Sequence, residues 1–298
     1  MTQIPFYIVD VFARDRYTGN PLAVVLDADD LSDREMQQIA QEMNYSETTY
    51  VSRKIAQNRG YNVRIFTPET ELPFAGHPTL GTAYIIKHFV VQESQTSQVL
   101  LNLKGGEIPV TFKPKDGDRE EIWMQQNPPQ FTEIFDPDEM AAVLSLDAEE
   151  IDSRFPVQAV STGVCFAIVP LRSLAAVKKA RLHRDRYFPW QNNTAARGIL
   201  LFCPETYAAE NDLNVRVFAE AVGVPEDPAT GSANGCLAAY LVQHQYWGCP
   251  SLKARVEQGY EIKRPSLLLL QASLNHSTWE ILVGGAVILV ARGELICT

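Results

Sequence analysis

The stretch Glu226-Asp-Pro-Ala-Thr-Gly-Ser-Ala-Asn234 places two carboxylates directly before a Gly-Ser step and an apolar segment. The apolar residues that follow recur at helical spacing: Leu237, Ala238, Leu241 and Val242. We therefore expect a helix that begins at Gly231 or Ser232. The first N–H groups of a helix have no partner within it, and together with the helix dipole they favour a bound carboxylate or phosphate. The stretch predicts an anion-binding site at a helix N-terminus.

A similar stretch occurs earlier in the chain. Arg64-Ile-Phe-Thr-Pro leads through Glu69 and Glu71 to Phe74-Ala-Gly-His-Pro and then to an apolar helix over residues 80–86. In the later copy, Arg216-Val-Phe-Ala leads through Glu226 and Asp227 to Ala229-Thr-Gly-Ser-Ala. The two arginines are 152 positions apart, and the glycines Gly76 and Gly231 are 155 positions apart. Two such units would direct two helix N-termini and several acid/base groups at one cleft, although short strand-loop-helix segments also recur by chance in mixed folds.

The length and the order of elements predict two α/β domains. At 298 residues and 46% hydrophobic, the chain can build two domains with cores of their own. Asn127-Pro128-Pro129 breaks the strand pattern and is the candidate linker, so we expect domains over residues 1–128 and 129–298. Beyond the linker the order of strands and helices largely repeats. The pattern is typical of an α/β duplication with helices packed among strands in each half.

Local signals predict several individual elements. Residues 6–12 and 22–26 are expected to form neighbouring strands. Ser32 and Glu35 form a capping box, which predicts the start of a helix that ends at Asn44. In the second half we expect helices over residues 136–144 and 171–180.

Composition excludes several classes of function. A net charge of −10 and a pI near 5.1 argue against a nucleic-acid partner, because a phosphate backbone requires a basic surface. Five cysteines without ligand spacing indicate reduced thiols in a cytoplasmic protein, and the N-terminus shows no signal peptide. The longest apolar run, residues 281–291, is too short to span a bilayer and is expected to form two buried strands and a turn. No nucleotide-binding motif is evident, and no cluster of histidines and carboxylates can be assembled from the sequence, so we expect no metal site.

Three further polar residues are candidates for chemistry. Glu47 lies at a strand entrance without a lysine or arginine nearby in sequence, where a carboxylate is either a solvated loop end or a general base. As a base it would need a pKa raised from about 4.3 toward 6 or 7, which costs about 3 kcal/mol. His77 lies at a predicted helix start, where an imidazole can exchange a proton with a bound anion. Asn20 follows Gly19 in a predicted loop, so turn chemistry is the alternative to a substrate-binding role.

Four blocks of sequence carry a family resemblance: Ser46-Glu-Thr-Thr-Tyr-Val, Arg64-Ile-Phe-Thr-Pro, Glu71-Leu-Pro-Phe-Ala-Gly-His-Pro-Thr-Leu-Gly-Thr-Ala and Glu226-Asp-Pro-Ala-Thr-Gly-Ser-Ala. They resemble the signature blocks of the PhzF-like phenazine-biosynthesis family, and the likeness covers nearly the whole chain. The resemblance implies the diaminopimelate epimerase-like fold. In that fold two similar α/β domains, each a barrel-like sheet around a central helix, flank the active site.

The resemblance also implies a cofactor-independent isomerase. In the phenazine enzyme a glutamate moves a proton between carbons of dihydro-hydroxyanthranilate, and the matching residue here is Glu47. The residues that match those holding and polarising the substrate are His77, Asp227 and Ser232. Gly76 and Gly231 match the glycines whose backbone N–H groups receive the substrate carboxylate. The expected ligand is a small anionic metabolite, and the expected assembly is a homodimer.

One difference from the wider superfamily narrows the chemistry. Diaminopimelate epimerases use a cysteine on each side of the substrate, and the positions aligned with those cysteines are Ala75 and Thr230. Neither can act as a thiolate base, so a two-cysteine racemisation is disfavoured. Two alternatives stay open beside the isomerase: an epimerase of an amino-acid derivative with Glu47 and Asp227 as opposed bases, and a non-catalytic carboxylate-binding protein.

Overall fold

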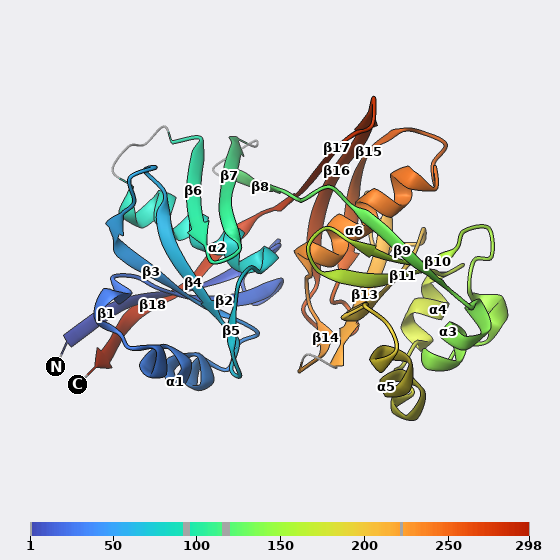
Figure 1. Cartoon of the computed structure of the whole chain (residues 1–298), viewed down its shortest axis with the longest axis horizontal. Coiled ribbons are helices and arrows are strands. Elements are labelled where there is room, and N and C mark those ends of the chain that lie inside the picture. The colour runs from blue at the N-terminus through green and yellow to red at the C-terminus, as the bar shows by residue number, and fades with distance from the viewer. Residues whose placement is uncertain (1, 92–95, 115–119, 221–222, 298) are drawn as a thin grey trace. The chain divides into compact units, whose positions relative to one another are not determined.

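The computed structural model describes residues 2–91, 96–114, 120–220 and 223–297, which form two units (Figure 1). Unit 1 comprises Met1–Gln125 and Gly284–Thr298, and unit 2 comprises Gln126–Val283. The predicted linker, Asn127-Pro128-Pro129, lies at the start of unit 2. The C-terminal segment differs from the predicted domain division, because it returns to unit 1 and pairs there with the first strand.

Unit 1 is built on a mixed sheet. Its strands are β1 (Thr2–Val11), β2 (Asn20–Val25), β3 (Thr48–Ile55), β4 (Tyr61–Phe66), β5 (Glu71–Leu72), β6 (Gln98–Leu103), β7 (Gly106–Pro114), β8 (Glu120–Gln125) and β18 (Val287–Cys297). β1 is antiparallel to both β18 and β2. The sheet continues through parallel β3, antiparallel β4, parallel β6, and antiparallel β7 and β8, and β5 pairs with the end of β4. β8 in turn contacts β18, so the strands wrap around the interior.

The helix α2 (Gly76–Ile85) fills the interior of unit 1. It contacts β1, β2, β3, β6, β7, β8 and β18, and all of its residues except Tyr84 are buried. A helix that is apolar on all sides needs such an environment, because no face of it can be left in water. Gly81 permits the close approach: a Cβ there would lie 2.6 Å from Leu22 Cδ2 and 2.9 Å from Val11 Cγ2.

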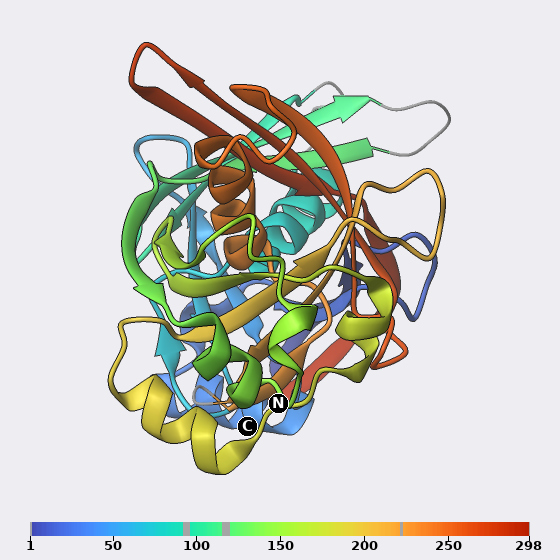
Figure 2. The ribbon, with the colours of Figure 1, turned by 90° about the vertical axis from the view of Figure 1, so that its right-hand side faces the viewer.

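Unit 2 is built on a second mixed sheet around the helix α6 (Gly231–Gln243) (Figure 2). Its strands are β9 (Gln130–Phe135), β10 (Val157–Ser161), β11 (Cys165–Pro170), β12 (Gly198–Cys203), β13 (Leu213–Ala219), β14 (Val224–Asp227), β15 (Ser251–Gln258), β16 (Ser266–Asn275) and β17 (Thr278–Gly285). α6 contacts β10, β11, β15 and β16, and it is buried from Ala233 to Val242. β16 and β17 are joined by His276-Ser277, which both have positive φ as in a type I′ hairpin.

The two units share one topology. β10 is antiparallel to β9 and β11, as β1 is to β18 and β2. After β11 come β12, which is parallel to β11, and β13, which is antiparallel to β12. The short β14, the central helix and β15, which is parallel to β13, follow. The elements from β3 to β6 in unit 1 have the same order and the same pairings. The predicted fold class, two similar α/β units with barrel-like sheets around central helices, is confirmed.

The outer helices cover the sheets. These elements are η1 (Ala28–Asp30), α1 (Asp33–Met43), η2 (Ile86–Val90), α3 (Pro137–Val143), η3 (Ala148–Glu150), α4 (Leu174–Lys179) and α5 (Arg184–Asn192). Among them, α1, α3 and α4 begin at a side-chain cap. The predicted capping box of Ser32 and Glu35 is complete, and α1 ends with Asn44 in the left-handed conformation. α3 and α4 occupy the two helical stretches expected in the second half. α5 was not predicted, because Pro189 interrupts its pattern.

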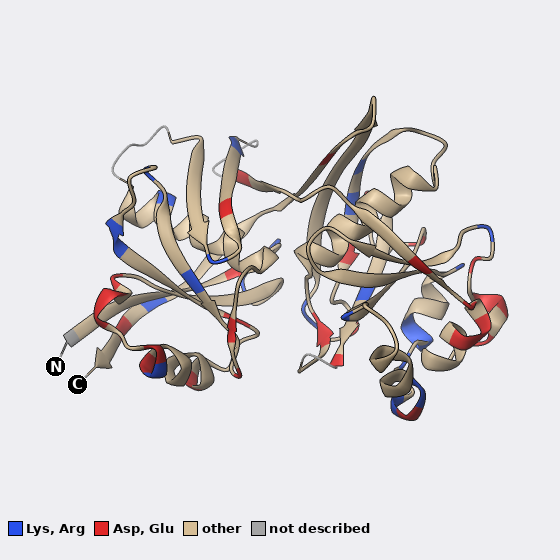
Figure 3. Ribbon diagram, viewed as in Figure 1, with Lys and Arg blue, Asp and Glu red and all other residues tan. Residues whose placement is uncertain are grey.

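Charged residues of both signs are interspersed on each unit (Figure 3). No helix in the described part of the chain is long and apolar enough to cross a membrane.

Candidate active site

The hairpin of β1 and β2 places Asn20 in unit 1. Gly19 precedes it with a φ of 68°, and a Cβ there would lie 2.4 Å from the Val11 carbonyl oxygen, so only glycine fits the turn. Asn20 is then the first residue of β2 and is fully buried. Turn chemistry therefore explains Gly19, while the Asn20 side chain points into the protein.

Asn20, Glu47 and His77 form a cluster at the N-terminus of α2, which we call the Glu47 cluster. The Asn20 amide nitrogen lies 3.2 Å from His77 Nδ1, and His77 Nε2 lies 3.4 Å from Glu47 Oε2. The Glu47 side chain is 16% exposed and that of His77 is 6% exposed. The Glu47 side chain is therefore largely buried, and the alternative interpretation of Glu47 as a solvated loop end is wrong.

Burial keeps His77 neutral. It lowers the pKa of His77 from 6.5 to about 3, against a backbone hydrogen bond with Pro21 that raises it. The contact with Glu47 is thus between a carboxylate and a neutral imidazole. The two ring nitrogens of His77 face different groups: Nδ1 faces the side-chain amide of Asn20, and Nε2 faces the carboxylate of Glu47. His77 Nε2 has no hydrogen bond within the described residues, so this nitrogen can pair with a ligand.

A buried hydroxyl pair links the strand after Glu47 to the helix that carries His77. Thr49 on β3 and Thr82 on α2 are hydrogen bonded at 2.8 Å, and both are fully buried. The pair anchors the start of β3 to α2, which limits the movement of Glu47 relative to His77.

The low pKa of His77 predicts a pH dependence of stability. Between about pH 6 and pH 4 the unfolded chain binds a proton at His77 that the folded chain does not, so the free energy of unfolding falls as the pH falls. We expect this residue to contribute a slope of about 1.4 kcal/mol per pH unit in that window. Urea denaturation across the window should show that slope reduced in His77→Gln. The exposed His183→Gln is the control, and an unchanged slope in His77→Gln would contradict the neutral imidazole.

A second polar group lies at the N-terminus of α6 in unit 2. It comprises Asp227, Thr230, Asn234 and Gln258, and we call it the Asp227 network. The Thr230 hydroxyl donates to Asp227 Oδ2 at 2.5 Å, and Gln258 Nε2 donates to the Asp227 carbonyl at 2.8 Å. Asn234 donates to the Thr230 carbonyl at 3.0 Å and to Gln258 Oε1 at 2.9 Å. Ser232, the second residue of α6, is partly exposed beside this network.

Both central helices begin without a side-chain cap. Their N-cap residues are Ala75 for α2 and Thr230 for α6, the two positions that the resemblance equates with the epimerase cysteines. In α1, α3 and α4 a serine or aspartate accepts a hydrogen bond from the first turn. The leading N–H groups at Gly76 and Gly231 are therefore not occupied by a capping side chain and suit an anion.

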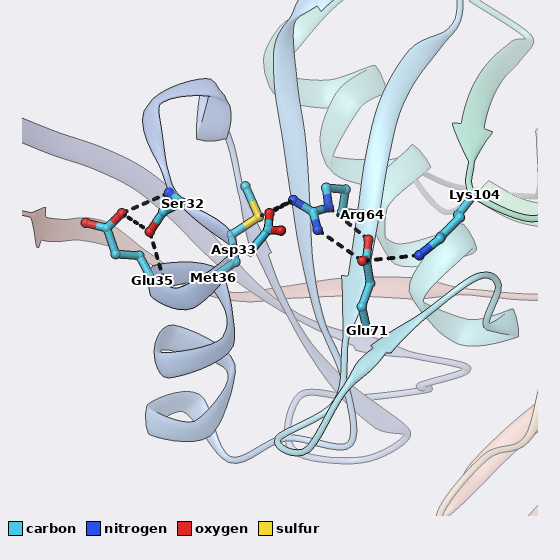
Figure 4. A network of polar contacts seen from close by, with 7 residues as sticks. All are labelled: Ser32, Asp33, Glu35, Met36, Arg64, Glu71 and Lys104. Carbon is cyan, nitrogen blue, oxygen red and sulfur yellow. Dashed lines mark hydrogen bonds and ion pairs between the residues drawn. The ribbon is translucent and has the colours of Figure 1, made fainter.

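An arginine braces the loop before each central helix. In unit 1, Arg64 Nε and Nη2 donate to the two carboxylate oxygens of Glu71 at 2.8 and 3.0 Å (Figure 4). Arg64 also donates to Asp33, and Lys104 lies 3.6 Å from Glu71. These hydrogen bonds, foremost that from Arg64, lower the pKa of Glu71 although burial opposes them.

The equivalent brace in unit 2 is more deeply buried. Arg216 Nε and Nη2 donate to the carboxylate of Glu226 at 2.9 and 2.8 Å, and Arg216 Nη1 donates to the carbonyls of Val177 and Ala180. The Arg216 side chain is 4% exposed, whereas that of Arg64 is 36% exposed. The same atoms pair in both braces, which supports the duplication predicted from the sequence and matches Glu226 with Glu71.

The strand registers show that the two copies of the duplicated unit carry different side chains at equivalent positions. Tyr50 faces Arg64 on β4, and Leu201 faces Arg216 on β13, so the position of Glu47 corresponds to Gly198 in unit 2. His77 corresponds to Ser232 by the spacing of the glycines. The carboxylate and imidazole of the Glu47 cluster therefore have no counterpart in the other copy.

The structure thus places the predicted site residues in two groups. Unit 1 holds Asn20, Glu47, Gly76 and His77, and unit 2 holds Asp227, Gly231 and Ser232. Sequence reasoning did not find Gln258, which reaches Thr230 from a strand far along the chain, and no local signal marks it.

Cys203 and Cys236 are buried thiols. Burial raises the pKa of Cys203 and of Cys236 to about 12, so neither is a thiolate at neutral pH. No group of three His, Cys, Asp or Glu within the described ranges is arranged to hold a metal ion.

Comparisons with known proteins find relatives over nearly the whole chain. A trans-2,3-dihydro-3-hydroxyanthranilate isomerase of Pseudomonas aeruginosa is 36% identical over 271 residues, which cover 90% of each chain. The crystal structure of a Bacillus anthracis phenazine biosynthesis protein of the PhzF family has a TM-score of 0.90 and 26% identity, with both chains fully covered. A predicted epimerase from Pseudomonas aeruginosa has a TM-score of 0.82 and 29% identity, again over the whole of both chains.

The architecture of two barrel-like units, each with a buried central helix, is the fold that the chain shares with these solved structures. The sequence profile described as "Phenazine biosynthesis-like protein" matches residues 9–293. The chain belongs to this family.

Proposed function

We propose that the protein is a cofactor-independent isomerase that moves a proton between carbons of a small carboxylated metabolite, with Glu47 as general acid and base. The observation that carries the proposal is the contact of Glu47 with a neutral, buried His77 at the start of α2. The isomerase name of the Pseudomonas aeruginosa relative supports the reaction class.

The mechanism follows from the chemistry of the Glu47 cluster. Glu47 takes a proton from a carbon of the substrate, and the electron pair left behind is delocalised as a dienolate. The neutral imidazole of His77 and the leading N–H groups of α2 stabilise this negative charge where it develops. Glu47 then returns the proton to a different carbon, so the reaction is redox-neutral and consumes no second reactant.

We assign substrate binding to the Asp227 network. We propose for Asp227, Gly231 and Ser232 the binding and polarising roles that the family resemblance implies. Asp227 as a second, opposed base is less well supported, because its Oδ2 already accepts the hydroxyl of Thr230 and the position equivalent to Glu47 in unit 2 is Gly198. This argument favours an isomerase over a two-base epimerase.

The test is proton NMR of the purified protein with trans-2,3-dihydro-3-hydroxyanthranilate in D2O. We expect deuterium to enter a ring carbon while the ketone isomer forms. If this compound is unchanged, the same exchange assay with amino-acid-derived carboxylates asks whether the substrate alone was misassigned. Absence of exchange across that panel, with carboxylate binding retained, would favour the non-catalytic binding protein.

A further inference from the structure

Gln258 on β15 makes three hydrogen bonds to the loop before α6 and one to Asn234 in the first turn of α6, and its side chain is fully buried. Nε2 donates to the Asp227 carbonyl at 2.8 Å and to Thr230 Oγ1 at 3.0 Å. Oε1 accepts from the Thr230 backbone N–H at 3.1 Å and from Asn234 Nδ2 at 2.9 Å. Both donors and both acceptor positions of the amide are therefore used.

Two of these partners determine the orientation of the amide. The Asp227 carbonyl can only accept and the Thr230 N–H can only donate, so a rotation of the amide by half a turn would break both bonds. Nε2 must therefore donate to the Thr230 hydroxyl. That hydroxyl, already an acceptor from Gln258, directs its own hydrogen to Asp227 Oδ2.

The consequence concerns the state of Asp227. A carboxylate that accepts a hydroxyl hydrogen is stabilised in its ionised form, and its Oδ2 is held in one place. Gln258 thus acts on Asp227 twice, through the backbone carbonyl of that residue and through the Thr230 hydroxyl.

Unit 1 shows that this fold does not require the network. The parallel pairing of β6 with β4 matches that of β15 with β13, which places Leu103 at the position of Gln258. By the spacing of 155 residues, Leu72 and Ala75 occupy the positions of Asp227 and Thr230. One copy therefore builds the same strand-helix junction from apolar side chains, and the polar set belongs only to the copy that carries Asp227.

We propose that Gln258 is a positioning residue, which orients Thr230 and thereby keeps Asp227 ionised and fixed for substrate. The kinetic consequences of this inference rest on the proposed function. The hydrogen bonds of Gln258 do not depend on that function and can be measured in the protein without substrate.

The kinetic test compares Gln258→Leu, which introduces the residue of unit 1, with Gln258→Glu. In Gln258→Leu we expect kcat to fall by about 10²-fold with a smaller change in KM, because Asp227 is no longer held in place. In Gln258→Glu an ionised carboxylate would take the Thr230 hydrogen from Asp227. The activity of this variant relative to the unmutated protein should therefore recover as the pH is lowered and the new carboxyl group is protonated.

The control is Gln158→Met. Gln158 is also largely buried in unit 2, and it contacts α6 at the opposite end, through His244 Nε2 at 2.8 Å. We expect it to leave kcat and its pH profile unchanged. A loss in Gln258→Glu that does not vary with pH would assign Gln258 a structural role only and overturn the proposal.

A double variant tests the route through Thr230. If Gln258 acts by orienting the Thr230 hydroxyl, Thr230→Val should remove most of the effect of Gln258→Leu, so the two losses will not add. Additive losses would show that Gln258 does not act through Thr230.

Hydrogen exchange in the substrate-free protein separates this inference from the proposed function. The Thr230 amide should exchange at least about tenfold faster in Gln258→Leu than in the unmutated protein, because it loses its acceptor. If the unmutated protein isomerises no compound but the Thr230 amide responds as expected, the proposed function fails and the positioning role of Gln258 stands. Unchanged exchange at the Thr230 amide would overturn the positioning role of Gln258, whichever substrate is found.

Discussion

Glu47→Gln is expected to abolish proton exchange at carbon while leaving the fold intact. The amide has nearly the same shape as the carboxylate but cannot accept a proton, so kcat for isomerisation should fall by about 10²–10⁴-fold. The change removes no packing, and His77 keeps a polar neighbour at the same place. Deuterium incorporation into substrate, followed by NMR, measures the loss directly.

A matched substitution separates the loss of the base from the loss of a charge. Glu42→Gln makes the same chemical change on the exposed face of α1 in the same unit and should leave the rate unchanged. Circular dichroism should be identical for both variants. Full activity in Glu47→Gln would refute its role as the base, and an equal loss in Glu42→Gln would point to net charge instead.

Arg216→Met is expected to give the largest loss of stability, about 3–5 kcal/mol in the free energy of unfolding of unit 2. The substitution leaves the buried carboxylate of Glu226 unpaired and removes the donor to the carbonyls of Val177 and Ala180. Denaturation followed by tryptophan fluorescence reports on unit 2, which contains three of the four tryptophans.

The duplicated brace supplies its own control. Arg64→Met breaks the same pair of hydrogen bonds in unit 1, but its partly exposed side chain lets water replace them, so we expect a loss of about 1 kcal/mol. Arg216→Met combined with Glu226→Leu should be more stable than Arg216→Met alone, because no charge is left buried. Equal losses in the two single arginine variants would show that burial does not set the strength of the brace.

Much of the fold could be predicted from local pattern. The capping box of Ser32 and Glu35 and the apolar run after Gly231 are complete within a few residues, so their physics is readable from neighbouring positions. The bracing arginines could be matched because each precedes its glycine at similar spacing. The pairing of β18 with β1 could not be predicted, because no local pattern records which distant strand is a neighbour.

The residues of the candidate site also differ in how far the sequence alone could predict them. Glu47 and His77 lie 30 positions apart in sequence, and only the family resemblance linked them before the structure placed their side chains together. Gln258 escaped because a glutamine near the end of a strand is ordinary in sequence, and its importance depends on a parallel pairing with β13. A side chain that acts through a second residue leaves no motif of its own.

The return of β18 to unit 1 has a consequence for synthesis on the ribosome. Unit 2 is continuous, so all of its strands have been translated once the chain has passed Gly285. β1 has two partners: β2 follows it closely in the chain, whereas β18 comes only after the whole of unit 2. One edge of β1 therefore stays unpaired until β18 has been translated, and we expect the sheet of unit 1 to be completed after the strands of unit 2 have been made.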